Sequence, residues 1–235
     1  MSEERTAPGE ESRPPRAGDP SPTEGDRAGR LGFVAHEVRN PLSTALWTAE
    51  LLARMSAADR GGARGEKMSA MMLRALGRVR QLVEDHFLTE RLDVGGIPLR
   101  PEPLPLRAAV EAAAARKPFD AGEVEVDVDE ALLVRADRVL LERALDAMVG
   151  AVGRDDAAVS AAARSRGARV LLRVVGAPVP DLALADPVKG SPSDTRGRAL
   201  GLPLARRIAA VLGGKLTAAE GGLVLELPAG EPDAG

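Results

Sequence analysis

Residues 33–52 read FVAHEVRNPLSTALWTAELL and decide the fold, because their apolar residues recur at helical spacing. At about 100° per residue, one face of such a helix carries Val38, Leu42, Ala45, Leu46, Ala49 and Leu52. The opposite face carries His36, Asn40, Ser43 and Trp47. The pattern predicts an amphipathic helix whose apolar face packs against other helices and whose histidine faces water.

His36 is the first candidate for chemistry in this helix. An imidazole on the wet face is chemically available and mostly neutral near pH 7. Glu37 follows directly, so we expect it to orient the ring or to take a proton from it. Pro41 removes a hydrogen bond to the carbonyl of Glu37 and loosens the helix. Asn40 stands where a zinc-binding HExxH motif needs its second histidine, which excludes that motif.

The run from His36 to Leu42, HEVRNPL, resembles the H box of bacterial histidine kinases at seven consecutive positions. In that family the histidine becomes phosphorylated and passes the phosphoryl group to an aspartate on a response-regulator receiver domain. The resemblance implies that His36 is the phosphoacceptor. It also implies phosphatase activity through the Glu-x-x-Asn pattern of Glu37 and Asn40. The alternative is an ordinary amphipathic helix with a surface histidine.

Composition limits the classes of protein that the chain can form. Its 235 residues suffice for one large or two small domains, and with 2% aromatic residues the cores must be built from Ala, Leu and Val. A net charge of −3 favours neither nucleic acid nor an anionic membrane as partner. The chain has no cysteine, which excludes disulfides and thiolate metal sites. No apolar run is long enough for a membrane span and the N-terminus is unlike a signal peptide, so we expect a cytoplasmic protein.

The N-terminal part of the chain predicts a disordered tail followed by a helical hairpin. Residues 1–28 have almost nothing to bury, which is typical of a disordered tail. Residues 30–56 and 68–92 show helical apolar spacing, and a glycine-containing turn separates them. One antiparallel hairpin leaves its apolar face half covered, whereas two copies close a four-helix bundle. We therefore predict an obligate homodimer through residues 30–92, within a dimerisation and phosphoacceptor domain over 29–92.

The C-terminal part predicts a second domain, so the fold class is α+β and multidomain. A proline- and glycine-rich linker is expected over 93–105, and a short tail over 229–235. Between them, the patterns predict helices at 106–115, 137–152 and 200–212, and strands at 123–129, 132–135, 159–163, 169–175, 215–219 and 222–227. This order resembles the ATP-binding α/β sandwich of histidine kinases over residues 106–228.

The same resemblance implies that the nucleotide site has degenerated. It places Gly150 at the asparagine that holds magnesium, Asp146 at an earlier asparagine, and Gly176 at the aspartate that recognises adenine. Of the second glycine box, Gly197 and Gly201 remain. No asparagine follows Asn40, and no Asp-x-Gly-x-Gly run occurs from 165 to 200. We therefore expect no ATP, no magnesium and no other metal to bind.

Three functions are compatible with these residues. The favoured hypothesis is histidine phosphotransfer between receiver aspartates through His36, with Arg39, Ser43 and Trp47 forming the receiver-docking surface. The second is a soluble cytoplasmic histidine kinase that autophosphorylates His36 with ATP and magnesium at a divergent site. The third is a non-catalytic dimeric scaffold that binds a receiver domain.

Overall fold

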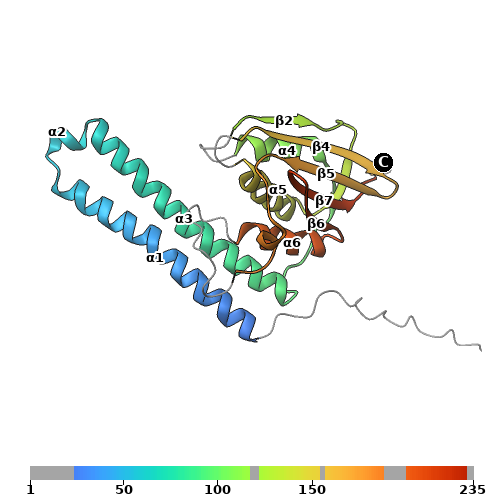
Figure 1. The fold of residues 1–235 in the computed structure, drawn as a ribbon, viewed down its shortest axis with the longest axis horizontal. Coiled ribbons are helices and arrows are strands. Elements are labelled where there is room, and N and C mark those ends of the chain that lie inside the picture. The colour runs from blue at the N-terminus through green and yellow to red at the C-terminus, as the bar shows by residue number, and fades with distance from the viewer. Residues whose placement is uncertain (1–23, 117–121, 154–156, 188–199, 232–235) are drawn as a thin grey trace, which may run out of the picture.

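The computed structural model describes residues 24–116, 122–153, 157–187 and 200–231. A long helical hairpin occupies the N-terminal part, and an α+β domain packs against the end of the hairpin that lies away from its tip (Figure 1). Of the tail expected over residues 1–28, residues 1–23 lie outside the described residues. The first helix begins at Glu24, so its first five residues belong to the segment predicted as tail.

The hairpin consists of α1 (Glu24–Arg54) and α3 (Ala63–Asp93), which run antiparallel. The predicted turn between them contains one further helical turn, α2 (Ala57–Arg60). The hydroxyl of Ser56 accepts a hydrogen bond from the amide of Asp59 and so caps α2. Pro41 lies inside α1 without ending it. The described helices include none that is long and apolar enough to cross a membrane.

The buried face of α1 is rotated by about 100° from the apolar face that the sequence predicted. Its members lie toward α3: Arg30, Phe33, Val34, Glu37, Pro41, Ala45 and Thr48. Leu46, expected on the packed face, is 59% exposed. Within this chain, α3 covers only the side of α1 that faces it, and Leu46 lies outside that side. Thr48 is accommodated there because its hydroxyl donates to the carbonyl of Thr44 at 2.7 Å.

The second domain contains a five-stranded sheet in the order β2-β4-β5-β7-β6. Its strands are β2 (Val124–Asp127), β4 (Val159–Arg166), β5 (Arg169–Val175), β6 (Lys215–Ala219) and β7 (Gly222–Pro228). β2 pairs with β4 in parallel, and the other pairs are antiparallel. The sheet and its helices confirm the predicted α+β class.

The predicted linker and C-terminal tail are both shorter than expected. β1 (Glu102–Pro105) lies in the linker segment and pairs with β3 (Leu133–Ala136) in a two-stranded sheet. The two prolines of β1 suggested a linker, but an edge strand tolerates proline because its outer side needs no amide donor. At the C-terminus, the amides of Ala229 and Gly230 donate to the carbonyls of Ala168 and Leu133.

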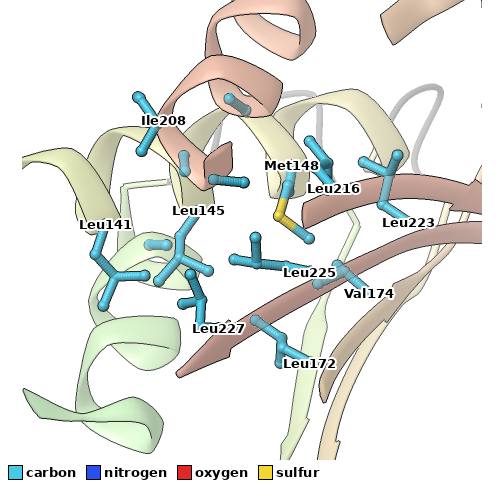
Figure 2. Close-up of a cluster of buried hydrophobic side chains, with 14 of the residues drawn as sticks. Leu141, Leu145, Met148, Leu172, Val174, Ile208, Leu216, Leu223, Leu225 and Leu227 are labelled. Atoms are coloured by element: carbon cyan, nitrogen blue, oxygen red, sulfur yellow. The ribbon is translucent and has the colours of Figure 1, made fainter. Parts of the chain in front are cut away.

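The core of this domain lies between the sheet and three helices, α4 (Leu106–Ala115), α5 (Arg138–Val152) and α6 (Gly201–Val211). Figure 2 shows side chains of α5 and α6 meeting those of β5, β6 and β7. The labelled core residues are Leu141, Leu145, Met148, Leu172, Val174, Ile208, Leu216, Leu223, Leu225 and Leu227. Asp137 caps α5, because its carboxylate accepts from the amides of Val139 and Leu140. The core is aliphatic, in agreement with the composition.

Candidate functional site

The exposed face of α1 carries the candidate histidine. His36, Asn40, Ser43 and Trp47 are all exposed, and Trp47 has 55% of its surface accessible. Their spacing places them in one stripe about 16 Å long, given a rise of about 1.5 Å per residue. Arg39 is exposed beside this stripe. The structure therefore brings the candidate phosphoacceptor and the candidate docking residues onto one accessible surface.

Glu37 lies on the buried side of α1. Its side chain is only 1% exposed, and its Oε2 is 3.5 Å from Nη2 of Arg78 in α3. Consecutive helical residues project about 100° apart, so adjacency in sequence does not bring this carboxylate to the imidazole. The expectation that Glu37 orients His36 or takes its proton is therefore not met in this conformation. Its visible role is an interhelical ion pair.

The second domain contacts the hairpin close to His36. Leu200, the residue just before α6, is buried against Phe33 and Val34 of α1 and Leu82 of α3. Val38 packs at the edge of this small apolar cluster. The start of α6 therefore packs against the hairpin within one helical turn of His36.

A buried ionic cluster holds the same domain further along α3. Arg30 is 0% exposed, and its guanidinium contacts Glu90 at 2.5 Å, Asp93 at 2.8 Å and Asp186 at 3.1 Å. Arg207 of α6 binds two of the same carboxylates, with Nε 2.8 Å from Asp93 Oδ1 and Nη1 2.7 Å from Asp186 Oδ1. We call these five residues the Arg30 cluster. It joins α1, α3, α6 and the segment after the short helix η1 (Asp181–Leu184).

Protonation equilibria in this region reflect both burial and charge pairing. Burial by itself would raise the pKa of Asp186, but hydrogen bonds and the positive charge of Arg207, together with Arg30, outweigh it and lower that pKa below its ordinary value. The pKa of Glu90 is lowered in the same way, against its burial, by Arg30. Asp186 and Glu90 are therefore held in their charged form.

A second charged contact lies nearer the middle of α3. Arg143 of α5 donates to Asp85 Oδ1 from Nη2 at 2.6 Å and to Gln81 Oε1 from Nη1 at 3.3 Å. Here burial dominates and raises the pKa of Asp85, while Arg143 offsets only part of that effect. The second domain is thus held to α3 at two separate places.

The positions that correspond to a nucleotide site offer few of its ligands. Gly150 is buried in α5 and brings no side-chain oxygen for a metal. Gly176 follows β5, where a Cβ would lie 2.6 Å from the carbonyl oxygen of Val152. The amide of Ala177 donates to that same carbonyl at 2.7 Å. An aspartate cannot occupy position 176 without a backbone shift, so Gly150 and Gly176 supply neither a metal ligand nor a carboxylate for adenine.

The remaining candidate positions are occupied by contacts within the protein. Asp146 accepts hydrogen bonds from Arg116 at the end of α4, with Nε 3.1 Å from Oδ1. At Gly201, the first residue of α6, a Cβ would meet that of Ala147 in α5 at 3.4 Å. Gly197 lies outside the described residues. The carboxylate of Asp146 is therefore already paired with a cation of the chain itself.

Comparison with known proteins identifies the fold. No protein-family model matches the sequence, and no curated protein sequence does. The histidine kinase AdeS of Acinetobacter baumannii matches with a TM-score of 0.58 and 17% identity, covering 82% of this chain and 97% of that one. Full-length ShkA in complex with AMPPNP gives a TM-score of 0.55 and 22% identity, over 87% of this chain and 46% of that one. Histidine kinase ThkA in complex with the response regulator TrrA matches with a TM-score of 0.52 and 16% identity, covering 86% of this chain and 61% of that one. The chain has the fold of sensor histidine kinases, with an ATPase-type second domain.

Proposed function

We propose that this protein transfers phosphoryl groups through His36 between receiver aspartates of a two-component system. The observation that carries the proposal is a water-exposed His36 on a histidine-kinase hairpin whose attached domain lacks fitting nucleotide ligands. One structural neighbour, ThkA, is seen in complex with a response regulator, which supports receiver domains as partners. The proposal places the protein in the cytoplasm and involves neither nucleic acid nor a membrane.

The transfer step follows from the chemistry of an exposed imidazole. A ring nitrogen of neutral His36 attacks the phosphorus of the aspartyl phosphate and forms a P–N bond. The bond between phosphorus and the aspartate oxygen breaks, and the carboxylate leaves with the electron pair. The proton of the other ring nitrogen passes to water, because Glu37 is paired with Arg78 on the buried side. We expect Asn40, one turn along, to hydrogen-bond the phosphoryl group or a hydrolytic water. Delivery to a second receiver reverses these steps.

Loss of ATP binding belongs to the same proposal. Without a side chain at position 150, the pocket lacks a metal ligand, and the metal is the main counter-charge for phosphoryl transfer from ATP. Without a carboxylate at position 176, the adenine amino group is left unpaired, at a cost of about 1–3 kcal/mol. The close approach of Gly176 to Val152 supports a site that has closed around its missing side chain.

A homodimer through residues 30–92 is also part of the proposal, because the hairpin leaves large apolar side chains exposed on both of its helices. Its exposed members are Leu31, Leu42 and Leu46 of α1 and Leu73, Leu76, Val83 and Phe87 of α3. On α3 they lie about half a turn away from Gln81 and Asp85, which face the second domain. From the phase of these positions relative to the buried faces of α1 and α3, and from the antiparallel course of the two helices, we infer that both apolar stripes lie on the same side of the hairpin. A second copy is the partner that would bury them in a four-helix bundle.

The deciding experiment is phosphotransfer from receiver domains charged with acetyl phosphate. We expect label to appear on the wild-type protein and not on the His36→Ala variant. Self-labelling with ATP and magnesium that disappears in His36→Ala would instead establish a histidine kinase. If charged receivers bind but neither transfer to His36 nor lose phosphate faster, the protein is a scaffold.

A further inference from the structure

Buried nitrogen atoms without a hydrogen-bond partner occur at the domain end of the hairpin. Among the described residues they include Nε of Arg27 and of Arg30 in α1 and Nδ1 of His86 in α3. All three residues act on one carboxylate, that of Glu90. Burial by itself would raise the pKa of Glu90, but Arg30, and to a smaller extent His86 and Arg27, lower it. The imidazole of His86 therefore lies within electrostatic reach of the Arg30 cluster.

His86 occupies the same side of α3 as two carboxylates of this cluster. His86, Glu90 and Asp93 recur at intervals of four and three residues, which is the spacing of one helix face. Glu90 and Asp93 both bind the fully buried Arg30 of α1, at 2.5 Å and 2.8 Å. The imidazole is half-buried, and its ring centroid lies 6.1 Å from that of Phe87. His86 thus lies one turn before the Arg30 cluster.

Charge in this region is balanced while the imidazole of His86 is neutral. The cations are Arg27 and Arg30 of α1 and Arg207 of α6. They face the three carboxylates of the Arg30 cluster, two on α3 and one after η1. Protonation of His86 adds a fourth positive charge without adding a carboxylate.

Two other carboxylates lie close to this group in sequence. Asp85 precedes His86 but projects about 100° away from it, toward α5, where Arg143 donates to it at 2.6 Å. Asp26 precedes Arg27 near the start of α1 and is exposed, so water screens its charge. Glu90 is therefore the carboxylate that His86 shares with the buried Arg30.

We propose that His86 is a pH-sensitive switch between the hairpin and the second domain, whose protonation weakens the Arg30 cluster and loosens the domain. An imidazolium carries a proton on Nδ1, and this buried N–H needs an acceptor. Glu90 lies one turn along α3, at the spacing at which side chains of a helix meet. Its side chain is 32% exposed and can turn from Arg30 toward His86. Arg30 then loses one of its three partners while it stays buried, which disfavours the docked domain.

The switch is separate from phosphotransfer, and the chain allows it to be tested cleanly. Histidine is the side chain whose ordinary titration falls between pH 5 and pH 8. The chain contains two histidines, and the other one, His36, is exposed and outside the Arg30 cluster. Burial raises the pKa of Asp85, but Asp85 is present in every variant compared and cannot cause a difference between them.

The test is the pH dependence of amide hydrogen exchange in α6, corrected for the intrinsic effect of pH on exchange. Between about pH 7.5 and about pH 5.5 we expect protection in the wild type to fall about tenfold, because one bound proton changes an equilibrium by at most about tenfold per pH unit. His86→Gln keeps a polar side chain without a titrating group and should show no such fall. His36→Gln is the matched control and should behave as the wild type.

A second measurement decides the question if His86→Gln does not fold. The Cε1 proton resonances of the two histidines are followed by NMR in the wild type over the same pH range, with His36→Gln to assign them. The loss of protection in α6 should follow the midpoint of the His86 resonance and should persist in His36→Gln. The inference is overturned if protection is independent of pH, if it rises in acid, if its loss disappears in His36→Gln, or if His86→Gln loses it equally.

Discussion

Replacing Arg30 by methionine should loosen the second domain from the hairpin while largely preserving packing volume. The guanidinium is fully buried and contacts three carboxylates, of which Asp93 is 7% and Asp186 26% exposed. Removing one partner of a buried ion pair costs about 3–5 kcal/mol, because the other charge is left uncompensated. Arg207 continues to neutralise Asp93 and Asp186 in the variant. We therefore expect the lower end, about 3 kcal/mol, which is about a hundredfold in the opening equilibrium.

Hydrogen exchange is the suitable assay because it reports opening locally. Amides of α6 and of the last turns of α3 should exchange about a hundredfold faster in Arg30→Met, with little change in α2 at the tip. Urea unfolding should show the matching loss of stability. Arg91→Met is the control, since it removes an exposed arginine from the same part of α3. If Arg30→Met exchanges no faster at α6 than Arg91→Met, the Arg30 cluster does not hold the domain.

Three other changes test separate features of the structure. The pKa of Asp186 is lowered on folding, so its contribution to stability is present above its ordinary pKa and is lost as the pH falls through the lowered value. Asp186→Asn should therefore lower the free energy of unfolding at pH 7. In strong acid the variant and the wild type should have the same free energy of unfolding, as measured with urea. Gly176→Asp restores the family residue, and its Cβ meets the carbonyl of Val152. We expect this variant to lose about 1–3 kcal/mol of stability and to gain no affinity for a fluorescent ATP analogue. Recovered binding of the analogue would contradict a nucleotide site that has closed at Gly176. Leu46→Glu/Phe87→Glu should yield a monomer in light scattering, and an unchanged dimer mass would rule out the apolar stripes as the interface.

Several elements could be predicted because their signals are local. Helical spacing predicted a helix at 137–152, where α5 lies, and strand patterns predicted strands at 159–163 and 169–175, where β4 and β5 lie. β1 was missed since its prolines are typical of a linker, and its pairing with β3 depends on residues about thirty positions away. A strand that owes its existence to a distant partner has little signal in its own sequence.

The candidate site also has one part that could be predicted from the sequence and one part that could not. That His36, Asn40 and Trp47 share one face follows from their phase on one helix, which the sequence contains in full. The inward direction of Glu37 does not, because it depends on which side of α1 meets α3 and on the presence of Arg78 there.

The amino-acid sequence by itself determined the helical hairpin, the order of elements in the second domain and the face that carries His36. Only the tertiary structure decided which side of α1 is buried, and how Arg30 and Asp186, 156 residues apart, come into contact. The physical reason is that periodicity shows which residues share one face of a helix or strand. Which segment covers that face is decided by packing between parts of the chain that are distant in sequence.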